Sequence, residues 1–84
     1  MSVEERILDA GFEDVVVLKD FDYEDALIGV SDDGRAVYDF DLMVAWLMET
    51  EGWEEIDAIE WIEYNTLRAL PYMGPQAPIV MYKV

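Results

Sequence analysis

The apolar and polar residues of the N-terminal part follow first a helical and then an extended pattern. A helix is predicted over about residues 3–10, because Ser2 and Glu5 have the spacing of a capping box and Gly11 can end a helix in the left-handed conformation. The β-branched run 15–18, Val-Val-Val-Leu, suits a strand buried on both faces better than a helix. The chain is therefore expected to begin with a helix and a strand.

Two further apolar runs surround a turn. Residues 26–30 and 35–38 flank the sequence Ser-Asp-Asp-Gly at 31–34, in which Gly34 can adopt the positive φ of a tight turn. This pattern predicts a β-hairpin.

The middle of the chain begins a helical hairpin. Asp39 or Asp41 can cap a helix over the apolar run 42–48, and Gly52 should end it. Because the apolar run covers every side of the helix, we expect a central, buried element with Trp46 in the core.

The second helix of the hairpin is expected from about residue 54 to residue 69. Trp53 precedes it as a staple residue, and Pro71 disfavours helical backbone at Leu70. At 100° per residue one face contains Ala58, Ile59, Ile62, Thr66 and Ala69, and the other contains Asp57, Glu60, Trp61, Tyr64 and Arg68.

The C-terminal part differs in charge from the rest. Fourteen consecutive residues, 69–82, carry no charge, and Pro78 can begin a last strand over 79–82. We expect this segment to be a core strand or, alternatively, the interface of a homodimer.

The predicted order of elements is α-β-β-β-α-α-β. It indicates one compact α+β domain over residues 1–84, with a small, mainly antiparallel sheet of three to four strands and the helical hairpin packed on one face.

Charge narrows the possible partners. The chain has 20 Asp and Glu against 5 Lys and Arg, which gives a net charge of −15 on 84 residues. Such a charge repels phosphates and anionic lipids and attracts basic proteins. The hydrophobic fraction of 54% is that of a folded domain rather than of an acidic disordered tail. The absence of cysteine, of an N-terminal apolar region and of an apolar run near the ~20 residues of a membrane span favours a cytoplasmic protein.

Catalytic chemistry has few candidate residues. The chain lacks histidine and cysteine, which are the commonest general base and the most reactive nucleophile, and Ser2 and Ser31 lie at a terminus and in a turn. Neither a glycine-rich phosphate loop nor another cofactor motif is present, so we expect a protein without enzymatic activity and without a cofactor.

A metal site is also not expected. Alternate acidic residues at 20, 22 and 24 imitate the start of a calcium loop, but Asp25 stands where the loop needs glycine and Ser31 where it needs glutamate. An acidic, solvated turn between two strands is the preferred interpretation.

Nucleic acids are disfavoured as direct ligands, because the five cations are dispersed along the chain. The inverse relation is possible. A dense field of carboxylates can imitate a phosphate backbone and compete for a protein that binds DNA or RNA.

Three stretches of the sequence resemble a known family. They are similar to a family of short, uncharacterised proteins carried by phages and other mobile elements of bacteria. The three stretches are AVYDF through GW over 36–53, AIEWIEYNT over 58–66 and RALPYMG over 68–74. The similarity extends over about residues 26–82. It implies an accessory or counter-defence role in which the protein binds and inhibits a host factor.

These observations favour a small acidic module that binds a basic protein. Aromatic side chains surrounded by charge are typical of binding hot spots. The candidate contact residues are therefore Asp57, Glu60, Trp61, Tyr64 and Arg68. Packing of the same aromatic side chains in the core is the competing interpretation. A nucleic-acid mimic and a structural homodimer that uses residues 69–82 are the alternative functions.

Overall fold

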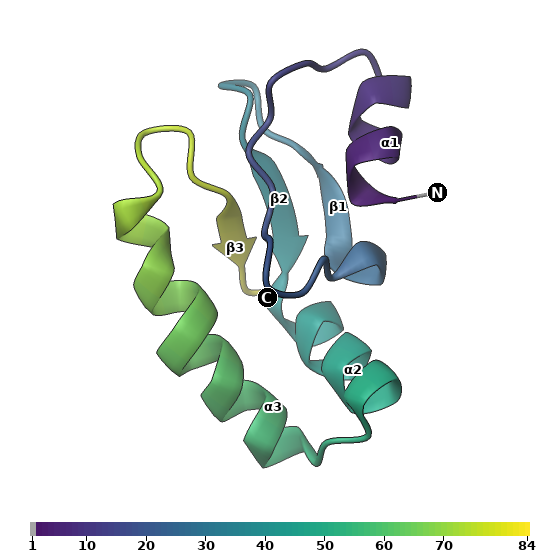
Figure 1. Cartoon of the computed structure of the whole chain (residues 1–84), viewed down its shortest axis with the longest axis vertical. Coiled ribbons are helices and arrows are strands. Elements are labelled where there is room, and N and C mark those ends of the chain that lie inside the picture. The colour runs from purple at the N-terminus through teal and green to yellow at the C-terminus, as the bar shows by residue number, and fades with distance from the viewer. Residues whose placement is uncertain (1) are drawn as a thin grey trace.

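The computed structural model describes residues 2–84 and has the predicted α+β architecture (Figure 1). Three helices and three strands follow in the order α1 (Val3–Asp9), β1 (Leu27–Val30), β2 (Ala36–Asp39), α2 (Phe40–Glu51), α3 (Glu55–Trp61) and β3 (Ile79–Met81). In this part of the chain no helix combines the length and the apolarity that a membrane span requires.

The predicted hairpin forms two of the three strands of the sheet, with β2 at the centre. β1 pairs antiparallel with β2 and places Leu27 opposite Tyr38, and Gly34 in the connecting turn has a φ of 82°. β3 lies on the other side of β2 and runs parallel to it, with Val37 opposite Ile79. The sheet is therefore mixed. A parallel neighbour requires a long crossover connection, and the helical hairpin between β2 and β3 supplies it.

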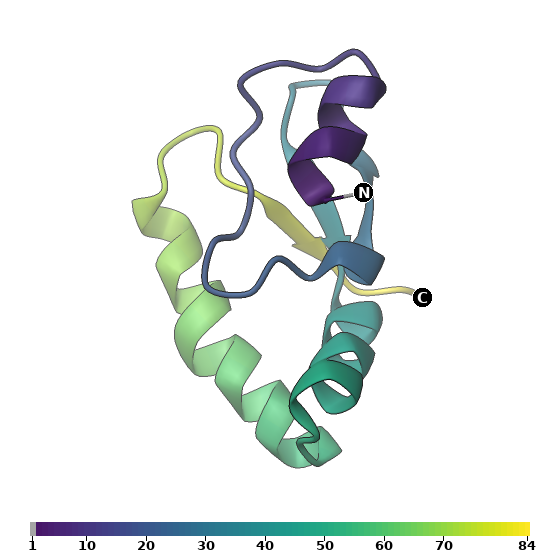
Figure 2. The same ribbon diagram turned by 45° about the vertical axis from the view of Figure 1, so that its right-hand side comes forward.

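The predicted strand at 15–18 is wrong. This segment belongs to an extended connection between α1 and β1, which crosses in front of β2 in Figure 1 and lies to one side of β1 and β2 in the turned view of Figure 2. Val17 and Leu18 are buried, and the backbone N–H of Leu18 donates to the hydroxyl of Tyr38, at 3.3 Å. The apolar run thus covers the face of the sheet. The run does not extend the sheet, because the backbone N–H of Leu18 donates to the side chain of Tyr38 and not to the backbone of a strand.

The ends of the helices agree with the local signals in the sequence. Ser2 and Glu5 form the capping box of α1. Asp39 caps α2 by accepting from the backbone N–H of Leu42 at 3.1 Å, and Gly52 ends α2 with a φ of 70°.

The expectation that α2 is buried on every side is wrong. Met43 and Leu47 are fully buried, whereas Leu42 and Met48 are 38% and 39% exposed. Trp46 is half-buried and packs at the edge of the core. α2 continues past the end of β2 (Figure 1), and its covered sides are those toward α3, the sheet and the 3-10 turn Glu24–Ala26.

α3 continues beyond Trp61 in a wider form. A π-helical segment over Ile62–Leu67 follows it, and a 3-10 turn over Leu70–Tyr72 ends the helical region. Ala58, Ile62 and Thr66 are buried as predicted, but Ala69 is exposed. The π-helical hydrogen bonds enclose one more residue than those of an α-helix, which turns the later side chains around the axis.

Two buried tyrosines connect the crossing segment to the rest of the molecule. The hydroxyl of Tyr23 lies 3.2 Å from the hydroxyl of Thr66. Burial raises the pKa of Tyr23 above its ordinary value of 10.0, although the hydrogen bond to Thr66 acts against this shift. Burial likewise raises the pKa of Tyr38, and the hydrogen bond from the backbone of Leu18 partly offsets the effect.

The first prediction concerns the two kinds of leucine on α2. Leu47→Ala should lower the free energy of unfolding by about 2–5 kcal/mol, because it creates a cavity in the core. Leu42→Ala on the exposed side should cost less than about 1 kcal/mol. Urea denaturation of both variants measures the difference, and equal losses would contradict the arrangement of α2.

The second prediction concerns alkaline pH. A tyrosine whose pKa is raised in the folded state stabilises the fold fully below pH 10, and this contribution is lost as the pH rises through the folded pKa. The free energy of unfolding of Tyr38→Phe should therefore fall less steeply than that of the wild type above pH 10. Urea midpoints measured at several pH values test it, and parallel curves would exclude this contribution.

Candidate protein-binding surface

The five residues predicted to form a contact surface lie along one helical stretch. Asp57, Glu60 and Trp61 belong to α3, Tyr64 lies in the π-helical segment, and Arg68 follows that segment. All are exposed except Trp61, which is half-buried. We name this set of five residues the outer stripe.

At its C-terminal end the outer stripe contains a cation–π pair. The guanidinium carbon of Arg68 lies 5.3 Å from the centre of the Tyr64 ring, and this ring is 64% exposed. At exposed sites such a contact contributes about 0.5–1 kcal/mol. It holds the Tyr64 ring in a defined place on the surface.

Trp61 belongs partly to the core. Its ring centre lies 4.9 Å from that of Phe21, in an edge-on arrangement, and 6.2 Å from that of Trp53, in a tilted arrangement. Phe21 also packs against Trp46, with the two ring centres 5.9 Å apart. The interpretation of Trp61 as a core residue is therefore confirmed in part, since its ring packs in an aromatic cluster, and a role of its exposed part in binding stays a prediction.

The two indoles form a shallow depression together with a carboxylate. This depression has a volume of about 210 Å³ and is lined by Trp53, Asp57 and Trp61, and we name it the tryptophan hollow. A cation is attracted by the faces of indole rings and by a carboxylate. The hollow thus combines the two groups that favour a lysine or arginine side chain.

The role of Phe21 was not predicted from the sequence. Residues 20–25 were expected to form an acidic turn, yet the segment Asp-Phe-Asp-Tyr-Glu alternates between polar and aromatic residues. In the structure Tyr23 is buried and Phe21 is half-buried, while Asp20 and Asp22 are exposed. This alternation is the signal that could have found the contact. Phe21 supports Trp61 from beneath and so fixes one wall of the tryptophan hollow.

Negative charge is concentrated on the helical hairpin. The thirty-two residues 36–67 contain nine carboxylates and no Lys or Arg. Eight of these carboxylates are exposed: Asp41, Glu49, Glu51, Glu54, Glu55, Asp57, Glu60 and Glu63. The hairpin therefore presents an acidic surface without an internal cation to neutralise it.

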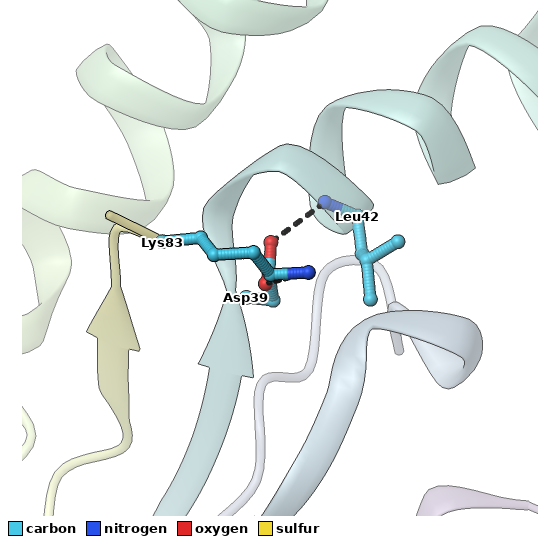
Figure 3. Close-up of polar contacts among 3 residues, drawn as sticks. All are labelled: Asp39, Leu42 and Lys83. Atoms are coloured by element: carbon cyan, nitrogen blue, oxygen red, sulfur yellow. Dashed lines mark hydrogen bonds and ion pairs between the residues drawn. The ribbon is translucent and has the colours of Figure 1, made fainter.

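The ninth carboxylate has a structural role (Figure 3). Asp39 is 1% exposed, and its Oδ1 accepts from the backbone N–H of Leu42. Its Oδ2 lies 3.6 Å from Nζ of Lys83 and makes no hydrogen bond. This ion pair fastens the residues after β3 to the start of α2.

The uncharged segment 69–82 is partly buried within the domain. Ala77 and Pro78 are buried and β3 is half-buried against β2, whereas Tyr72 is 89% exposed. A homodimer through this segment stays a prediction.

The acidic turn at 20–25 has its own internal bonds. Oδ1 of Asp22 accepts from the backbone N–H of Glu24 at 3.2 Å, and a 3-10 turn covers Glu24–Ala26. Within residues 2–84, no three acidic side chains are grouped closely enough to hold a metal ion.

Comparison with known proteins gave no relative. A scan against family models found no match, and searches of curated proteins and of solved structures found no similar protein. The function of this protein is therefore inferred from its own charges and exposed aromatic side chains.

Proposed function

We propose that this protein is an acidic module that binds a basic protein through the outer stripe, Asp57, Glu60, Trp61, Tyr64 and Arg68. The observation that carries the proposal is the tryptophan hollow, which lies within the stretch 36–67 that has no Lys or Arg. A lysine or arginine of the partner would enter the hollow, where it would contact the two indoles and meet the carboxylate of Asp57.

Two ranges of attraction act together in this proposal. The net charge of −15 steers a basic partner from a distance, which raises the association rate. The aromatic groups act only on contact and slow dissociation. Tyr64, held by Arg68, extends the aromatic surface along the helix from the hollow.

A second candidate function rests on the uninterrupted run of acidic groups in the sequence of the hairpin. Eight exposed carboxylates without an intervening cation over 36–67 resemble the uninterrupted charge of a phosphate backbone. The basic partner would then be a DNA-binding or RNA-binding protein. The resemblance to phage and mobile-element proteins supports an accessory role of this kind, directed at a host factor.

The third prediction tests steering by charge. Raising the salt concentration from about 50 to 500 mM should slow association with a captured basic partner much more than it changes dissociation, since the Debye length falls from about 14 to about 4 Å. Surface plasmon resonance separates the two rates. An association rate that is independent of salt would reject the steering, and competition by duplex DNA for the partner would identify the mimic.

The fourth prediction tests the hollow itself. Asp57→Asn removes the carboxylate but keeps the shape, and it should speed dissociation by roughly tenfold if a cation occupies the hollow. Asp32→Asn in the exposed turn removes the same charge elsewhere and should change dissociation little.

Tyrosine variants provide a second matched pair. Tyr64→Ala should also speed dissociation, whereas Tyr72→Ala removes an even more exposed tyrosine outside the outer stripe and serves as its control. Equal effects within both pairs would remove the outer stripe from the interface.

A further inference from the structure

A second hollow lies between the two helices of the hairpin, outside the outer stripe. It has a volume of about 330 Å³. Its lining consists of Phe40, Asp41, Val44, Ala45 and Met48 of α2 and Glu55 and Ile59 of α3, and we name it the hairpin groove.

The floor of the hairpin groove is apolar and partly open. Phe40 and Val44 are buried and Ile59 is half-buried, whereas Ala45 is exposed and Met48 is 39% exposed. The outward side of a helix in a soluble protein normally carries polar residues. Apolar side chains that line an open groove are therefore groups that a partner can cover.

Carboxylates mark both ends of this apolar floor. Asp41 lies in the first turn of α2 and Glu55 in the first turn of α3. Since the helices form a hairpin, Glu55 belongs to the end near Met48, and Asp41 is seven residues, or about 10 Å, from Met48 along α2. Residues 36–67 contain no Lys or Arg, and Lys83, which lies beside the start of α2, is paired with Asp39.

We propose that the hairpin groove binds a basic amphipathic helix of the partner, with apolar side chains about one and two turns apart in the groove and Lys or Arg beside them. This inference rests on the proposed function and names the shape and chemistry of the partner. The length of the floor matches two helical turns, and the acidic ends match flanking cations.

The surroundings of the groove favour this occupant over others. The backbone groups of α2 and α3 bond within their helices, so they give a β-strand no edge to pair with, whereas a helix satisfies its own backbone. A second copy of this chain would bring another −15 of charge to an acidic surface. Met48 contributes a flexible, polarisable side chain, which adapts to different apolar anchors.

The experiment uses the full chain and two synthetic peptides made only of leucine and lysine. In one peptide the leucines follow the helical spacing, and in the other the same residues are scrambled, so both carry the same charge. Calorimetry at about 150 mM salt, near physiological ionic strength, should show tighter binding of the patterned peptide. Equal affinities would overturn the groove while leaving charge steering in place.

A pair of α2 variants separates packing from charge. Met48→Glu adds one negative charge, so electrostatics alone predicts equal or tighter binding of the patterned peptide, whereas occupation of the groove predicts a loss of about tenfold or more. Thr50→Glu adds the same charge on the exposed α2 surface without lining the groove, and it should not weaken binding. Equal affinities of the two variants would overturn the proposal.

Three controls test whether the variant folds, whether the outer stripe binds the peptide instead, and whether a second copy occupies the groove. Met48 is partly exposed, and the urea midpoint of Met48→Glu verifies that the variant folds; if it does not, Ala45→Glu on the same groove replaces it. A loss of peptide binding in Tyr64→Ala but not in Met48→Glu would keep the outer stripe and reject the groove. Light scattering that shows a dimer abolished by Met48→Glu would make a second copy the occupant and also overturn the proposal.

Discussion

The packing of Tyr23 is the interaction on which the arrangement of the other elements depends. Its ring centre lies 5.4 Å from that of Trp46 and 6.4 Å from that of Tyr38, and its hydroxyl meets that of Thr66. One side chain thus joins the crossing segment to α2, to the sheet and to the π-helical part of the last helix. Its φ of 47° is left-handed, which costs a residue other than glycine about 1–2 kcal/mol. The surrounding contacts must outweigh this cost.

The same contacts fix the surface. Phe21 lies two residues before Tyr23 and is held in the aromatic cluster, where it supports Trp61. The tryptophan hollow on α3 and the buried tyrosine below it are therefore parts of one packing unit. A rigid support of this kind lowers the entropy that a binding surface loses when a partner arrives.

Three of the five cations make contacts within the molecule that do not involve the exposed carboxylates of the hairpin. The guanidinium of Arg6 donates to the carbonyl oxygens of Glu24 and Leu27, at 2.6 and 3.0 Å, and Nε of Arg35 donates to the carbonyl of Ala77 at 2.7 Å. Lys83 pairs with Asp39. These contacts connect elements far apart in sequence. The hairpin, with no Lys or Arg of its own, keeps its charge for the solvent side, where both proposed contact surfaces lie.

The sequence by itself determined the features that depend on neighbours along the chain. The capping box, the Asp39 cap, the left-handed glycines and the β-hairpin use bonds within a few residues, so their signals are local. It also determined the acidic charge of residues 36–67 and the exposed side of the last helix, which carries Asp57, Glu60 and Tyr64. Only the tertiary structure decided that β3 runs parallel to β2, that residues 15–18 cover the sheet instead of joining it, and that α2 exposes Met48. Those outcomes depend on contacts such as Leu18 with Tyr38 and Phe21 with Trp61, which join residues far apart in the chain, and no local pattern of hydrophobicity encodes the partner of a buried side chain.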